Sequence, residues 1–152
     1  MLRRRAASIA AVGLFAFQSA VADPVAVVPW EALAQVTVVR QKDRYIPEFS
    51  KQIVALDNRE VKLRGFMLPL EPGARQKRFL LSAQPPECAF CMPGTAEQFA
   101  EVQARVAVPY VTDPIIVSGR FMLVRDESGG LLYRLTDAAV VEDDVQPKRG
   151  PK

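Results

Sequence analysis

From Val61 to Val141 the chain is a series of short apolar segments separated by proline, glycine and aspartate residues, and few folds accommodate such a pattern. Val61–Phe66 alternates apolar with basic residues, Phe79–Leu81 is a short apolar run, and Ile115–Val124 is the longest segment. Segments of this length and composition predict β-strands joined by turns. We therefore expect a mainly β protein without long helices.

Two of the predicted strands contain an internal glycine, in the related segments Gly65–Leu68 and Gly119–Leu123. Gly65 interrupts the alternation as a β-bulge would, and both glycines allow a strand to bend. Five or six short, bent strands predict a small, partly closed antiparallel β-barrel of the oligonucleotide/oligosaccharide-binding (OB) type, with one or two short helices. An open two-layer sheet is the alternative.

The other predicted elements are short. Pro29 suits the first position of a helical turn, and Glu48–Ala55 has the apolar spacing of a second short helix. Thr136 and Asp137 can cap a further short helix or turn. Additional strands are expected at Val36–Val39, Phe99–Val106 and Leu131–Leu135.

Residues 1–22 have the three parts of a cleavable secretory signal peptide. Arg3, Arg4 and Arg5 form its positive region, an apolar stretch follows, and Ala20–Ala22 supplies the small residues of a cleavage site. The apolar stretch is shorter than the roughly 20 residues that cross a bilayer. We expect cleavage after Ala22 and a periplasmic or secreted protein with no stable membrane anchor.

The expected mature protein has three parts: an extended leader at 23–29, a single β-rich domain at 30–141 and a disordered tail at 142–152. The whole chain has 20 basic and 17 acidic residues, and the signal peptide carries three of the arginines and no acidic residue. The mature chain is therefore neutral. Because nucleic-acid binding needs a clustered basic face, we expect no nucleic-acid partner.

The strongest functional feature is a C-x-x-C motif formed by the chain's two cysteines, Cys88 and Cys91. In an oxidising compartment a structural disulfide is the default for such a pair, although closing so short a loop contributes only about 2 kcal/mol. A redox-active dithiol is the second reading. Glu87 disfavours a thiolate at Cys88, and the βαβ pattern of a thioredoxin-like protein is missing.

Metal binding is the third reading of the motif. Cys88 and Cys91 can bind one soft ion, and Met92 adds a thioether. A site of thiolates and a thioether suits Cu(I) better than Zn(II). Zn(II) would need further cysteine or histidine ligands, and the chain has no other cysteine and no histidine. Met67 and Met122 would approach this site if the sheet curls, although methionine in strands ordinarily fills the core.

Other catalytic groupings are missing from the sequence. Without histidine, Ser-His-Asp and Cys-His sites are impossible within this chain. The carboxylates are scattered rather than paired in apolar surroundings, and there is no glycine-rich phosphate loop. We therefore expect no conventional enzyme and no catalytic residues.

The order of these motifs resembles that of an uncharacterised family of exported, single-domain bacterial proteins. The resemblance implies an accessory role linked to metals, because some members are encoded beside components of ABC-type metal transporters, particularly for zinc. Many relatives combine cysteine with histidine in the loop that here holds Cys88 and Cys91, and this chain lacks the histidine. The matching segments are Trp30-x-x-Leu33, Leu56–Val61, Leu63–Leu70, Phe79–Leu81, the cysteine loop into Pro93-Gly94, Val117-x-Gly119 and Leu132–Leu135.

The sequence thus predicts a non-enzymatic periplasmic binding or accessory protein. Its loop at Cys88 and Cys91 would be disulfide-bonded, or would bind Cu(I) or Zn(II) when reduced, and its partner would be a periplasmic protein or a metal-transport component. One alternative is a thiol–disulfide exchange protein that attacks through Cys88. The other is an interaction module in which the disulfide stiffens a binding loop.

Overall fold

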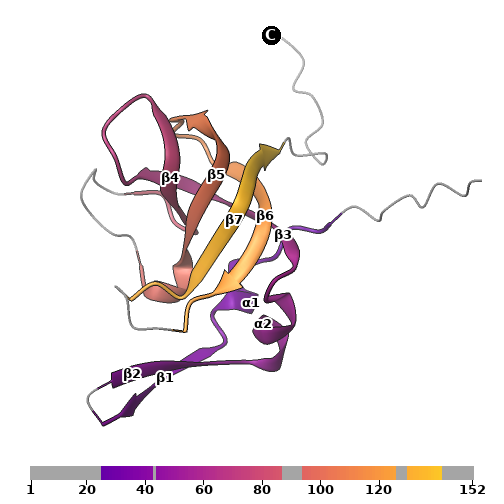
Figure 1. Ribbon diagram of the computed structural model, residues 1–152, viewed down its shortest axis with the longest axis vertical. Helices are drawn as coiled ribbons and strands as arrows, with labels where there is room; N and C mark the ends of the chain where they lie inside the picture. Colours follow the sequence, from indigo (N-terminus) through magenta and orange to yellow (C-terminus); the bar gives the residue numbers. More distant parts are fainter. Residues whose placement is uncertain (1–24, 43, 87–93, 126–129, 142–152) are drawn as a thin grey trace, which may run out of the picture.

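The computed structural model describes residues 25–42, 44–86, 94–125 and 130–141 (Figure 1). Strands dominate this part of the chain, and its helices are short. The elements are α1 (Trp30–Leu33), β1 (Val36–Gln41), β2 (Arg44–Phe49), α2 (Lys51–Leu56), β3 (Glu60–Pro69), β4 (Arg75–Ser82), a 3-10 turn η1 (Ala96–Gln98), β5 (Phe99–Pro109), β6 (Ile115–Leu123) and β7 (Tyr133–Val141).

Five strands form a closed barrel in the order β3-β4-β5-β7-β6, and β3 also pairs with β6. Neighbouring strands are antiparallel except β5 and β7, which are parallel. A five-stranded Greek-key barrel is the architecture of OB folds. The prediction of a small OB-like barrel is therefore confirmed, and the barrel is closed rather than partly closed.

Strand β3 shows how the alternating sequence fills the barrel. Its buried residues are Val61, Leu63, Gly65 and Met67, in strict alternation. The predicted bulge at Gly65 is wrong, because pairing with β6 continues without a shift up to that residue. Gly65 instead lies where β4 crosses closely: a Cβ there would collide with the main-chain carbonyl oxygen of Ser82.

A bulge does occur in β7. Asp137 has a positive φ of 50°, and the pairing of β7 shifts there against both β5 and β6. Aspartate tolerates this left-handed backbone better than most residues, which suits it to a bulge. The predicted helix cap or turn at Thr136 and Asp137 is therefore wrong, since both residues lie inside β7.

The segment before the barrel closes one of its ends (Figure 1). Leu33 of α1 and Ile53 of α2 are fully buried in the same core as the barrel residues. The Tyr133 hydroxyl donates a hydrogen bond to the main-chain carbonyl of Leu33, and the rings of Phe49 and Tyr133 lie 6.0 Å apart between centroids. These contacts attach α1 and the end of β2 to the start of β7.

Strands β1 and β2 form a separate hairpin that extends beyond the barrel (Figure 1). The sequence predicts the first half of this hairpin but not β2. The second helix begins at Lys51 rather than Glu48, because Arg44–Phe49 pairs with β1 and Ser50 caps the helix by accepting from the Ile53 amide. None of the described helices has the length and hydropathy needed to cross a membrane.

Candidate binding site

The predicted site residues Cys88, Cys91 and Met92 lie outside the described residues. Met67 is buried inside the barrel. The strand register places Met67 and Met122 at opposite ends of the β3–β6 pair, so the expectation that both approach one site is wrong. Within the described ranges, no group of three or more cysteine, aspartate or glutamate residues could hold a metal ion.

The described residues instead form a groove with a volume of about 330 Å³ on the outer face of β4 and β5. Phe79, Ala100 and Val102 belong to the barrel core, so the side chains next to them along these strands face outward. Two of these, Phe99 and Glu101, are nevertheless almost fully buried, at 3% and 4% exposure. The groove is lined by Leu70, Arg78, Leu80, Gly94, Ala96, Phe99, Glu101, Gly130 and Leu131.

Three chain connections meet at this groove. Leu70 follows β3, Gly130 and Leu131 precede β7, and Gly94 and Ala96 follow residues 87–93. Pockets that bind small molecules have volumes of about 300–1,000 Å³, so this groove is at the small end of that range.

The rim at Gly94 and Ala96 is positioned by local hydrogen bonds. The Thr95 amide donates to Oε1 of Gln98 at 3.3 Å, and the two residues form a capping box around η1. The Ala83 amide in turn donates to the Gln98 carbonyl at 3.0 Å, which attaches η1 to the end of β4. Gly94 has a φ of 98°, a conformation that favours glycine.

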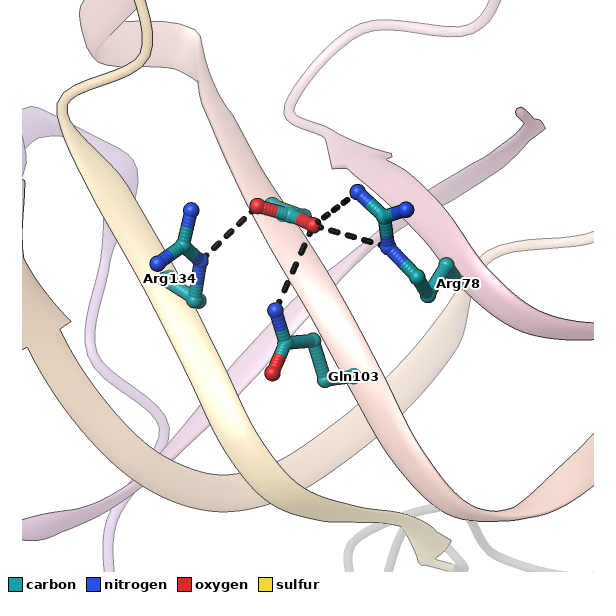
Figure 2. Close-up of polar contacts among 4 residues, drawn as sticks. Arg78, Gln103 and Arg134 are labelled. Atoms are coloured by element: carbon teal, nitrogen blue, oxygen red, sulfur yellow. Dashed lines mark hydrogen bonds and ion pairs between the residues drawn. The ribbon is translucent and has the colours of Figure 1, made fainter. Parts of the chain in front are cut away.

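A buried carboxylate links three strands beside the groove (Figure 2). Oε1 of Glu101 on β5 accepts from Nε and Nη2 of Arg78 on β4, at 3.1 and 2.8 Å, and from Nε2 of Gln103 at 3.4 Å. Oε2 accepts from Nε of Arg134 on β7 at 2.8 Å. The Glu101 side chain is 5% exposed, whereas those of Arg78 and Arg134 are 56% and 36% exposed.

These contacts determine the charge of the cluster. Burial raises the pKa of the Glu101 carboxyl, but hydrogen bonds from Arg78, Arg134 and Gln103 outweigh burial and bring the pKa below its ordinary value. The hydrogen bond and the charge of Glu101 raise the pKa of Arg78. Glu101 is therefore a carboxylate near neutral pH, and because it bridges two arginines the cluster carries one positive charge.

Residues 26–142 match the family model DUF3299, which is described as a protein of unknown function. The chain belongs to the DUF3299 family. Among solved structures, it is similar to a DUF3299 family protein from Pseudomonas aeruginosa PAO1, with 25% identity, a TM-score of 0.49, and coverage of 64% of this chain and 69% of that chain. No curated protein matches this DUF3299 chain.

Sequence reasoning missed the cluster in this DUF3299 protein. Arg78, Glu101 and Arg134 lie on segments predicted as strands or close to them, and their opposite charges are the available signal. Their meeting depends on register, because Glu101 lies directly across from Arg134 in a parallel pair and from Leu80 on the other side. A parallel neighbour for β5 does not follow from the alternation of residues.

Proposed function

We propose that this DUF3299 protein is an exported, non-enzymatic binding protein of the periplasm, and that the groove on β4 and β5 is its binding site. The observation that carries the proposal is the groove itself. The exposed face of an antiparallel sheet is ordinarily polar, whereas here a buried Phe99 and several leucines line a cavity beside a fixed charge cluster.

The position of the groove supports the same conclusion. OB barrels bind ligands on the face of their second and third strands, between the loops that join strands 1–2 and 4–5. In this barrel those strands are β4 and β5, and the corresponding loops contribute Leu70, Gly130 and Leu131 to the groove. Because this comparison concerns the fold alone, the class of ligand has to be inferred from the side chains that line the groove.

The chemistry of the lining residues favours binding over catalysis. Glu101 is the carboxylate among the described lining residues, and both of its oxygens accept hydrogen bonds from arginine. A carboxylate with a lowered pKa is a weak general base, and it is not protonated near neutral pH to act as an acid.

The C-x-x-C motif belongs to this proposal through its place in the chain. Residues 87–93 join Pro86 to Gly94, and Gly94 lines the groove. We propose that Cys88 and Cys91, which precede Gly94 in the chain, are disulfide-bonded or bind a soft metal together with Met92. The donor set favours Cu(I) over Zn(II), and the partner would be a periplasmic protein or a metal-transport component.

Intact and native mass spectrometry of the protein isolated from the periplasm tests this proposal. It reports the cleavage site, the thiol state, any bound metal and any retained ligand together. Leu80→Arg would block the groove, and Val106→Arg makes the same change at a 72% exposed position of β5 outside the lining. We expect a ligand adduct in the wild type and in Val106→Arg but not in Leu80→Arg.

Two outcomes of this experiment would contradict the proposal. A chain that still begins at Met1 would refute export by a cleaved signal peptide. Equal retention of the adduct by Leu80→Arg and the wild type would show that the groove is not the binding site.

A further inference from the structure

The side chain of Arg78 is the charged group that the groove offers to a ligand. It lines the groove and is 56% exposed. Its Nε and Nη2 both donate to Glu101, and its remaining nitrogen points away from that carboxylate (Figure 2). Glu101 thus fixes the guanidinium in one orientation and leaves one edge with N–H donors.

The charge of the cluster favours an anion at this edge. Two arginines share one carboxylate, so one positive charge is not balanced within the cluster. An arginine that is already oriented loses little further freedom when it binds a planar carboxylate, and such hydrogen bonds between charged groups are the strong ones. Glu71 is an exposed residue whose charge acts on Arg78, so it would compete with a bound anion.

The remaining lining residues indicate that the rest of the ligand is apolar. Leu70, Leu80, Ala96, Phe99 and Leu131 present apolar side chains to the groove. The groove volume of about 330 Å³ lies near the lower limit of the roughly 300–1,000 Å³ of small-molecule pockets. That size suits a small molecule rather than an extended polymer.

We infer that the groove binds a small amphiphilic carboxylate, with its hydrocarbon part against Leu80 and Phe99 and its carboxylate on Arg78. The inference rests on the proposed function, because it names the ligand class of the same groove. Arg134 has a positioning role: it holds Glu101, and Glu101 in turn orients Arg78.

Hexanoate, 1-hexanol and hexylamine test the inference, because they have the same chain and different head groups. Each is titrated into the full mature chain, and the backbone amide shifts of Leu80, Phe99 and Leu131 are followed by NMR. Because a hydrogen bond between charged groups distinguishes hexanoate, we expect it to bind at least about tenfold more tightly than the other two.

Three variants separate the charge from the apolar surface. Arg78→Gln should reduce hexanoate binding to the level of hexanol. Glu71→Gln should strengthen hexanoate binding about twofold to threefold, because it removes the competing charge without touching the groove. Arg105→Gln, an exposed arginine of β5 outside the lining, should leave the affinity unchanged. The melting temperature of each variant identifies any loss of folding.

The outcomes also separate this inference from the proposed function. Equal binding of hexanol and hexanoate in the groove, or tighter binding of hexylamine, overturns the carboxylate assignment and leaves the binding site intact. An acetylated dipeptide with a leucine carboxylate that binds tenfold more tightly than hexanoate would make the occupant a peptide end. If no probe shifts the groove residues, the ligand class is wrong; loss of the native adduct in Leu80→Arg would still support the groove.

Discussion

Replacing Glu101 by glutamine measures how much the buried carboxylate contributes to holding β4, β5 and β7 together. Glutamine has nearly the same shape, but it removes the negative charge and places an amide N–H₂ against an arginine. A hydrogen bond to a charged group contributes about 1.5–3 kcal/mol. The partner side chains are 56% and 36% exposed and regain water when released, so we expect a smaller loss, about 1–2 kcal/mol of unfolding free energy.

The loss should depend on pH with a definite sign. The folded-state pKa of Glu101 lies below its ordinary value. A carboxyl with a lowered folded-state pKa stabilises the protein above the unfolded pKa, and this contribution disappears as the pH falls through the folded-state pKa. The difference between the wild type and Glu101→Gln should therefore be complete at pH 7 and shrink below about pH 4.

Urea denaturation of the mature chain at pH 7 and at pH 3 measures this difference through the transition midpoints. Glu60→Gln is the matched control, because Glu60 is an exposed strand residue that accepts one hydrogen bond from Ser118. It should change the unfolding free energy by no more than about 0.5 kcal/mol. An equal loss for Glu101→Gln at both pH values, or a loss no larger than that of Glu60→Gln, would refute the reasoning.

Substitutions at Gly65, Tyr133 and Asp137, with Gly130 as a control, test the barrel. Gly65→Ala should lower the unfolding free energy by about 2–3 kcal/mol in urea denaturation, because the added Cβ collides with the Ser82 carbonyl. Gly130→Ala is the control: its Cβ meets no atom within 4 Å, so it should lower the unfolding free energy by only about 1 kcal/mol, through the positive φ of Gly130. Tyr133→Phe should cost about 1–2 kcal/mol in calorimetry, because a buried carbonyl of α1 loses its donor. Asp137→Gly should be tolerated and Asp137→Val should destabilise, and equal midpoints for the pair would contradict the bulge.

The barrel strands are predictable because their residues alternate between core and solvent. In β3 the alternation predicts that Val61, Leu63 and Met67 are buried. It does so only if Gly65 is counted as a buried position of the same series and not as a bulge. The bulge at Asp137 is not predictable in this way. It arises where β7 pairs on both sides, and a local cap signal at Thr136 and Asp137 is overridden by that pairing.

The candidate site is less predictable than the fold. Arg78 and Arg134 are 56 positions apart in the chain, and they meet at Glu101 only because β5 lies between β4 and β7. Single-strand patterns carry no information on that order. For the cysteine motif the situation is reversed. Its spacing is recognised directly in the sequence, whereas Cys88 and Cys91 lie outside the residues that the structure describes.

The parallel pairing of β5 with β7 has a consequence for when the molecule can fold. The final strand of the domain is an interior member of the ring, with a neighbour on each side. Until it has emerged, β5 and β6 each keep an open edge, and Arg134 is not there to hold Glu101. The barrel of such a chain can therefore close only after synthesis has passed Val141.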